Sequence, residues 1–242
     1  MNELSYCGAL VRDYDRDRFL ISLFAPADRQ EALWALFAFN HEIAKTREVV
    51  SDATLGRIRL QWWMDAIRNF YESGVVPEHE ILKPLCAAIQ KYQLPMEDFA
   101  TLIAARNFDL DARTFDNIDE CLSYAEASSV PLWALAVRME GFDPAYEPVQ
   151  AVGLNYAIAG ILRAAPYQKV QGWDVLPVAP SEIGAHFVRK ARSQSRVLRA
   201  AQGMARLYMQ RIRALGYELE NPKMAVPVAF KELRVTLAVV KG

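Results

Sequence analysis

The chain has few of the features that mark secreted, membrane-spanning or metal-binding proteins. Its three cysteines are odd in number and have no CxxC pair, which indicates reduced thiols in a reducing compartment. No apolar run approaches the roughly 18 residues that a membrane-spanning helix needs. The N-terminus has no apolar signal core and is too acidic for a typical transit peptide. His41, His79 and His186 lie far apart without HxxxH or HExxH spacing, so no metal site of that kind is predicted.

Motifs of several common enzyme folds are also missing. The sequence contains no GxSxG elbow, no Walker loop and no GxGxxG fingerprint. Its net charge of −1 gives no overall attraction to nucleic acid, and we expect no nucleic-acid partner. The alternation of apolar and polar residues that marks a half-buried strand is absent as well.

The composition fits one large helical domain. With 242 residues, of which 52% are hydrophobic, the chain can bury a sizeable core. Apolar residues at helical spacing, with breaks at Pro, Gly, Ser and Asp, predict about eight to ten helices. We therefore predict a single all-α domain over residues 1–242. The principal helices are expected over residues 6–14, 29–50, 55–71, 81–92, 95–111, 117–141, 149–165 (ended by Pro166) and 181–215.

The segment LGRIRLQWWMDAIRNFY, at residues 55–71, predicts a core helix. Its apolar face is broad and carries Trp62 and Trp63 together with Leu55. Arg59 falls near the middle of that face, and an unpaired buried charge is very costly. Arg59 therefore forms an ion pair or reaches the surface, or else it contacts an anion or ligand in an internal pocket.

Polar residues on otherwise apolar helices are the remaining candidates for a site. Each one alone is more often structural than functional, but together they suggest helices whose inner faces enclose a cavity with polar ends. The small residues Ala157, Ala159 and Gly160 would add room beside Arg163. The candidate cavity and ligand-binding residues are Asn40, His41, Glu48, Arg59, Asp109, Tyr156 and Arg163.

Four segments, in order, carry a family resemblance. They read QEALWALFAFNHEIAKTRE at residues 30–48, RIRLQWWMDAI at 57–67, LIAARNFDLDARTF at 102–115 and GLNYAIAGILRAAPYQKVQGWDVLP at 153–177. The chain thereby resembles the squalene/phytoene synthase family over roughly residues 5–215. The resemblance implies an isoprenoid-synthase-type helical bundle around a central cavity, walled by the helices over residues 29–50, 55–71, 99–111 and 149–165.

The resemblance also implies where this sequence departs from active members. Those members bind prenyl diphosphates through magnesium held by two Asp-rich motifs that face each other across the cavity. The first motif, DDxxD, aligns here with Ala44, Lys45 and Glu48, and the aspartates of the second align with Ala164 and Gln168. Without those carboxylates, compensation of the leaving-group charge is implausible. We therefore expect no catalytic residues, no metal and no cofactor, and no turnover of farnesyl or geranylgeranyl diphosphate.

A closer likeness points to a non-catalytic branch of the family. The segments ARNFDLDARTFDNIDECLSYAE at residues 105–126 and GILRAAPY at 160–167 resemble the branch that includes an assembly factor of mitochondrial respiratory complex I. This implies a lipid- or prenyl-binding module, or an assembly module with a respiratory complex subunit as partner. It also implies a cytoplasmic or mitochondrial-matrix-like location, with a peripheral position on the inner membrane as a further expectation.

Two alternatives stay open on the sequence alone. One is an active head-to-head prenyltransferase of isoprenoid biosynthesis, which would use magnesium. The other is a purely structural interaction protein whose cavity is filled.

The last strong helix, from Ser181 to Leu215, carries basic residues and no acidic residue from 183 to 217. One-sided basic helices often lie on membranes, so we predict a peripheral surface for an anionic membrane or an acidic partner. The alternative is that this stripe pairs inside the fold with the acidic segment at residues 97–126. The basic residues are Arg189, Lys190, Arg192, Arg196, Arg199, Arg206, Arg211 and Arg213.

Arg59 and Arg163 each lie on an apolar or small-residue face of an expected helix. We predict that they point towards one cavity or ion-pair network, with Asp109 or Glu48 as the counter-charge.

Overall fold

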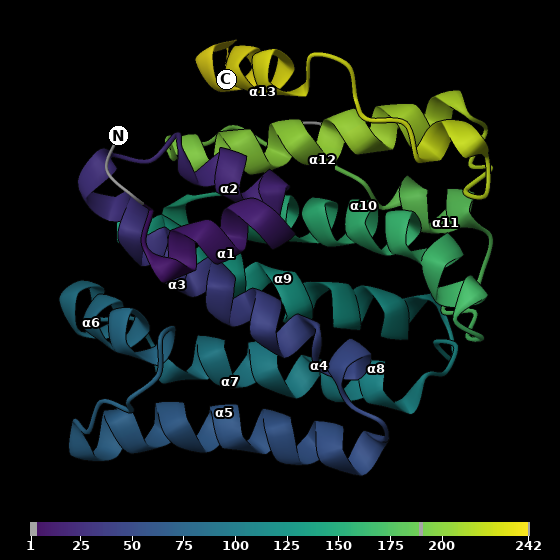
Figure 1. Cartoon of the computed structure of the whole chain (residues 1–242). Coiled ribbons are helices and arrows are strands. Elements are labelled where there is room, and N and C mark those ends of the chain that lie inside the picture. The colour runs from purple at the N-terminus through teal and green to yellow at the C-terminus, as the bar shows by residue number, and fades with distance from the viewer. Residues whose placement is uncertain (1–3, 189–190, 242) are drawn as a thin grey trace.

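Helices in stacked layers make up the whole described fold (Figure 1). The computed structural model describes residues 4–188 and 191–241, and these contain no β-strand, which confirms the predicted all-α class. The helices are α1 (Tyr6–Tyr14), α2 (Arg16–Ser22), α3 (Ala27–Ala44), α4 (Thr46–Val49), α5 (Ala53–Ser73), α6 (Leu82–Tyr92), α7 (Met96–Ala105), α8 (Asn107–Asp111), α9 (Ile118–Glu140), α10 (Val149–Val170), α11 (Pro180–Ala185), α12 (Arg196–Ala214) and α13 (Lys231–Lys241), with short 3-10 turns η1 (Pro144–Tyr146) and η2 (Pro222–Met224).

Local sequence sets several of these boundaries. The Asp52 carboxylate caps α5 by accepting hydrogen bonds from the backbone N–H groups of Thr54 and Leu55. Asn117 caps α9 in the same way, and Gly141 ends it with a φ of 90° that suits glycine. These caps fix where α5 begins and where α9 begins and ends.

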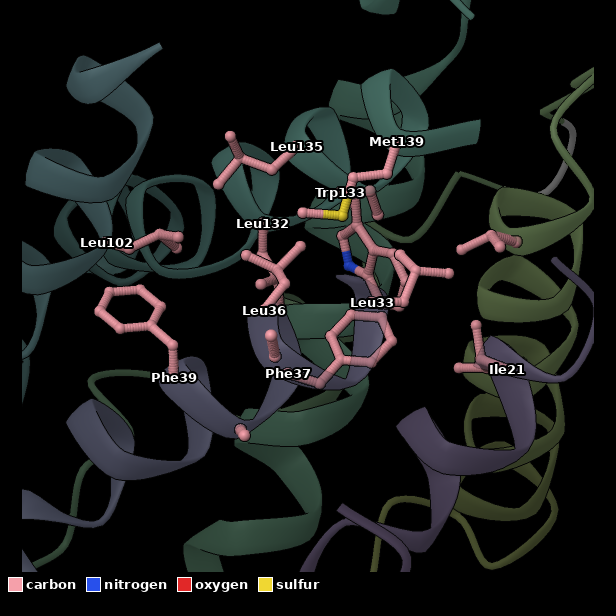
Figure 2. Close-up of a cluster of buried hydrophobic side chains, with 14 of the residues drawn as sticks. Ile21, Leu33, Leu36, Phe37, Phe39, Leu102, Leu132, Trp133, Leu135 and Met139 are labelled. Atoms are coloured by element: carbon pink, nitrogen blue, oxygen red, sulfur yellow. The ribbon is translucent and has the colours of Figure 1, made fainter. Parts of the chain in front are cut away.

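The core lies between α3 and α9. In the segment of α3 from Leu33 to Phe39 every side chain is buried except Trp34, which is partly exposed. Phe37 meets Trp133 of α9 edge-on, with ring centroids 5.9 Å apart (Figure 2). Phe39 meets Trp63 of α5 with ring centroids 5.5 Å apart. Large apolar side chains fill this part of the interior, which explains why α3 is apolar almost all round.

α9 and α10 cross at close range. A Cβ atom added to Gly153 of α10 would lie 2.8 Å from the Cα atom of Val130 on α9, so only glycine fits there. At the same crossing the Ser129 hydroxyl donates a hydrogen bond to the Gly153 carbonyl oxygen over 2.8 Å. This crossing fixes the position of α10, which carries much of the site described below.

The helix with two tryptophans lies farther out than the sequence predicted. α5 packs on the outer side of α7 and α8 and forms the edge of the molecule opposite α13 (Figure 1). Trp63 is buried, but Trp62 is 47% exposed and Leu55 is 48% exposed. The prediction that this helix walls the cavity is therefore wrong, because α7 and α8 lie between it and the interior.

Other expected boundaries are also wrong. The helices expected over residues 29–50 and 95–111 are each divided, the first into α3 and α4 and the second into α7 and α8. α10 continues through Pro166 to Val170, because a proline in the last turns costs one backbone hydrogen bond and the helix tolerates that loss here. The single helix expected over residues 181–215 is divided into α11 and α12. A further helix, α13, follows a loop and packs on α12.

α12 is an inner helix rather than a peripheral one. It lies between α10 and α13, and its small residues Ala200, Ala201 and Gly203 are buried. Arg211 donates hydrogen bonds to the carbonyl oxygens of Val226 and Pro227, and Arg213 donates one to Gly184. The prediction of one continuous basic helix is therefore wrong, and Arg211 and Arg213 bond to carbonyl oxygens rather than to the acidic segment at residues 97–126. Arg189 and Lys190 lie outside the described residues.

Candidate functional site

A cavity of about 820 Å³ opens beside the filled core. Its wall combines charged side chains from α2, α4 and α8 with small and aromatic side chains from α9, α10 and α12. Ala157 and Gly160 of α10 lie on this wall, as the sequence predicted, and leave the space open, whereas Ala159 is buried away from it. Nothing lies within 4 Å of a Cβ atom added to Gly160.

The two motif positions meet at this cavity. Ala44 at the end of α3 and Glu48 of α4 lie on one wall, and Ala164 and Gln168 of α10 lie on another. Lys45 is not among the lining residues, because its ammonium pairs with Glu42 at 2.5 Å. The cavity thus brings together residues about 120 positions apart, as the alignment with the family's motifs implied.

Asp17 is the centre of an ion-pair cluster on the cavity wall. Its carboxylate accepts hydrogen bonds from Lys231 of α13 at 2.7 Å, from the Tyr208 hydroxyl at 2.6 Å and from Arg163 at 3.3 Å. The Arg163 guanidinium also lies 3.6 Å above the centre of the Tyr208 ring. Burial alone would raise the pKa of Asp17, but the hydrogen bonds from Lys231 and Tyr208 outweigh it and lower that pKa. The cluster ties α2, α10, α12 and α13 together.

A second pair, Arg18 with Asp15, lies next to this cluster. Asp15 caps α2 and also pairs with the partly buried Arg18, whose guanidinium lies 5.0 Å from the centre of the Tyr156 ring. Burial alone would lower the pKa of Arg18, but the charge of Asp15 outweighs it and raises that pKa, so the arginine stays charged. Burial raises the pKa of the Tyr156 hydroxyl, which stays neutral at pH 7.

A third pair, Arg106 with Asp109, lies where α7 meets α8. Asp109 accepts a hydrogen bond from the Tyr124 hydroxyl at 2.7 Å, and Arg106 lies 3.5 Å from its other oxygen. Burial raises the pKa of Asp109, and the charge of Arg106 offsets only part of that rise. This carboxyl group therefore holds a proton more readily than an exposed aspartate does.

The cavity has an excess of positive charge. Six basic and four acidic side chains line it. No carboxylate of the described residues lies within ion-pair distance of Arg16 or Arg47, and the buried Nε atom of Arg47 has no hydrogen-bond partner. Such a wall attracts an anionic group. The basic residues are Arg16, Arg18, Arg47, Arg106, Arg163 and Lys231, and the acidic ones are Asp15, Asp17, Glu48 and Asp109.

Three predicted site residues lie elsewhere. Asn40 is buried in the core, and His41 stacks on Tyr14 with ring centroids 5.5 Å apart. Burial lowers the pKa of His41. Arg59 pairs with Glu42 at 2.6 Å, on the side of α3 that faces α5. None of the three is among the lining residues.

The prediction that Arg59 and Arg163 share a network is wrong. Arg59 pairs with Glu42, whereas Arg163 pairs with Asp17, and neither contacts Asp109 or Glu48. The reason is the outer position of α5, from which Arg59 reaches α3 but not α10.

The sequence reasoning missed the contribution of α2 and α13. Asp15, Asp17 and Arg18 line the cavity from α2 and its cap, and none of them was among the predicted site residues. An available signal was the pair of charges at Asp17 and Arg18, directly before the apolar run from Phe19 to Ile21. Lys231 had no comparable signal, because its role depends on how α13 folds back.

The sequence is similar to known proteins over most of its length. The squalene/phytoene synthase family model matches residues 11–180. The human NADH dehydrogenase (ubiquinone) complex I assembly factor 6 is 30% identical over 175 residues, which is 72% of this chain and 52% of that protein. The chloroplastic phytoene synthase 1 of Arabidopsis thaliana is 21% identical over 182 residues, or 71% of this chain and 42% of that protein. The chain spans about half the length of the curated relatives it matches.

Solved structures share the fold. A dehydrosqualene synthase crystallised with a ligand superposes with a TM-score of 0.75 at 14% identity, covering 98% of this chain and 94% of that one. The squalene synthase HpnC of Alicyclobacillus acidocaldarius gives a TM-score of 0.63 at 18% identity, covering 97% and 88%. The isoprenoid-synthase-type fold is thereby confirmed, and the chain belongs to the squalene/phytoene synthase family.

Proposed function

We propose that this protein is a non-catalytic member of its family that holds a prenyl or lipid-like ligand and acts in the assembly of respiratory complex I. One observation carries the proposal. The cavity wall has Ala44, Ala164 and Gln168 at positions where the family resemblance implies magnesium-binding aspartates. Removal of those carboxylates removes the charge compensation on which ionisation of a diphosphate depends.

The carboxylates that the cavity does have are unsuited to a magnesium cluster. Asp15, Asp17 and Asp109 are each paired with an arginine, and Asp17 also with a lysine. Among the described residues, no group of three or more His, Cys, Asp or Glu side chains could share a metal ion. Glu48 is exposed and belongs to no cluster of possible metal ligands among the described residues. The proposed ligand binding therefore uses arginine side chains and no metal.

The cavity suits a ligand with an anionic head and an apolar body. Its volume of about 820 Å³ is in the range of small-molecule sites. The unpaired guanidinium groups of Arg16 and Arg47 offer donors to a phosphate or carboxylate. Phe115, Ile161 and Trp173 give apolar surface for a hydrocarbon chain.

The relatives support the assembly role. Assembly factor 6 of complex I in human is named for that task, and its 30% identity covers most of this chain. We accordingly propose a respiratory complex subunit as the protein partner. The same proposal places the protein in a mitochondrial-matrix-like or cytoplasmic compartment, peripherally at the inner membrane.

Binding and turnover measurements test the ligand part directly. Calorimetry with geranylgeranyl diphosphate, with magnesium and with EDTA, should show binding that does not need the metal. Arg47→Ala should weaken it roughly tenfold, because a hydrogen bond to a charged group is lost. Ala164→Phe should abolish binding by filling the cavity, whereas Ala87→Phe on the exposed side of α6 should not change it.

Incubation with labelled farnesyl or geranylgeranyl diphosphate and magnesium should release no diphosphate above a no-protein control. Squalene, phytoene or released diphosphate above that control would establish the prenyltransferase alternative. Mass spectrometry of lipid extracted from the purified protein should find a prenyl or lipid species in the wild type and the Ala87→Phe control but not in Ala164→Phe. Equal amounts of lipid in all three, or none in any, would contradict the ligand role.

A further inference from the structure

α13 exposes a continuous apolar stripe at the edge of the molecule. Leu233, Leu237 and Val240 are 57%, 44% and 76% exposed, and their spacing puts them on one side of the helix. Phe230, just before the helix, is 77% exposed. The loop residue Val226 is also 54% exposed. On the opposite side of α13, Val235 and Val239 are buried. The helix is therefore apolar on two sides, and only one of them is used inside the fold.

α13 is held in place with this stripe facing outwards. It forms the outermost layer on α12 (Figure 1), where Ala238 closely approaches Gly203. Lys231 pairs with Asp17 at one end, and Arg234 donates a hydrogen bond to Gln210 of α12 over 3.0 Å. These contacts fix the rotation of the helix about its axis, so the exposed stripe is a built surface.

A basic groove runs beside the stripe. A depression of about 440 Å³ between α12, α13 and the loop that joins them has Arg211, Lys223 and Arg234 in its wall and no acidic residue. No carboxylate of the described residues forms an ion pair with any of these three cations. Arg211 donates instead to the carbonyl oxygens of Val226 and Pro227. The groove therefore presents only positive charge, next to apolar side chains.

We propose that α13 and this groove bind the surface of an anionic phospholipid membrane. The apolar stripe enters the boundary between headgroups and acyl chains, and the groove takes a lipid phosphate. Amphipathic helices with basic flanks bind anionic lipid in this way. No helix of the described residues is long and apolar enough to span a bilayer.

A second exposed apolar stripe shows why the charge pattern favours lipid at α13. On α5, Leu55 and Ile58 are as exposed as the α13 residues, but arginines of that helix are paired with carboxylates. Arg57 pairs with Asp111, and Arg68 pairs with Asp65. Paired charges give little attraction to an anionic surface, whereas the unpaired cations beside α13 do.

This inference rests on the peripheral location in the proposed function and names the surface responsible. It replaces α12, whose position between α10 and α13 leaves it no broad exposed face. It is independent of what the cavity binds, because α13 presents its stripe on the side away from Lys231 and Asp17.

Vesicle flotation of the full chain tests it. Vesicles of phosphatidylcholine alone are compared with vesicles that also contain phosphatidylglycerol, at low and at high salt. The wild type should bind the anionic vesicles and not the neutral ones, and high salt should weaken the binding. Leu233→Ser/Leu237→Ser should reduce partitioning roughly tenfold or more. Lys223→Gln/Arg234→Gln should reduce it roughly fivefold per charge on anionic vesicles.

The matched control is Leu55→Ser/Ile58→Ser, which removes equal apolar surface from α5 and should bind like the wild type. If Leu233→Ser/Leu237→Ser fails to fold, Phe230→Ser, just before α13, provides the same test. A wild type that ignores anionic vesicles would overturn both this inference and the peripheral location. Unchanged binding by the α13 variants would overturn this inference alone. Light scattering that shows a dimer dissociated by the α13 variants, with vesicle binding unchanged, would assign the stripe to a second copy of the chain.

Discussion

Two interiors lie side by side in this molecule, one filled and one hollow, and the same helices build both. α3 contributes Phe37 to the filled core and Ala44 to the cavity. Trp133 of α9 and Tyr156 of α10 meet at the boundary, with ring centroids 4.9 Å apart. In the core, large apolar side chains meet one another, whereas around the cavity small residues alternate with charged pairs. Side-chain volume and charge, rather than helix arrangement, decide which part of the interior stays open.

Two glycines of α10 show the difference between the filled core and the cavity. Gly153 and Gly160 lie seven residues apart, on nearly the same face of the helix. A Cβ atom at Gly153 would clash with the backbone of Val130, whereas one at Gly160 would meet nothing within 4 Å. The same residue type is thus required for close packing in the filled half and leaves open space in the hollow half.

The largest loss of stability should follow from removing a large side chain from the filled core. Trp133→Ala should lower the free energy of unfolding by about 3–5 kcal/mol, because it removes a fully buried aromatic side chain and leaves a cavity. Urea denaturation followed by circular dichroism measures the change. Trp62→Ala on the exposed side of α5 is the control and should cost far less. Equal losses in the two variants would contradict the division into a filled interior and an outer helix.

The second-largest loss of stability should follow from adding a side-chain atom to the filled core. Gly153→Ala places a methyl group against the backbone of Val130, which cannot move aside as a flexible side chain can. Such overpacking typically costs about 1–3 kcal/mol, and we expect a loss of that size in the same urea assay. A stability equal to the wild type would show that α9 and α10 can separate without penalty.

The filled half could be predicted from the sequence far better than the hollow one. The sequence from Leu33 to Phe39 is apolar, as expected for a central helix, and an aspartate suited to cap a helix stands at position 52, just before α5. Trp62 was misassigned because periodicity shows an apolar face without showing whether another element covers it. The Asp17–Lys231 pair joins residues 214 positions apart, so no local pattern could reveal it.

The charge of Asp17 in the wall of the cavity should make a smaller, pH-dependent contribution to the free energy of unfolding. Asp17→Asn should cost about 1 kcal/mol at pH 7, because a neutral amide is a weaker acceptor than the carboxylate. The pKa of Asp17 is lowered in the folded state, so the ionised group stabilises the fold above roughly pH 4, near its ordinary value, and this contribution is lost as the pH falls through the lowered pKa.

The difference in unfolding free energy between wild type and Asp17→Asn should therefore shrink as the pH falls below roughly 4. Urea titrations of both proteins at several pH values measure it. A difference that stays constant down to the lowest pH at which both fold would rule out Asp17 as the titrating group. Lys231→Met removes one partner from the other side and should lower stability at pH 7 as well.

The smallest effect, and the only gain, should come from adding one methyl group to the hollow half. Gly160→Ala lies inside α10, where alanine is favoured over glycine by about 0.5–1 kcal/mol, and the added Cβ atom meets nothing within 4 Å. Thermal and urea unfolding should therefore show a modest increase in stability. Gly172→Ala is the matched control, because its Cβ atom also meets nothing within 4 Å but its φ of 96° strains any other residue. Gly172→Ala should be destabilised while Gly160→Ala gains. A loss at Gly160 would mean that the wall of the cavity closes on the space that this glycine leaves.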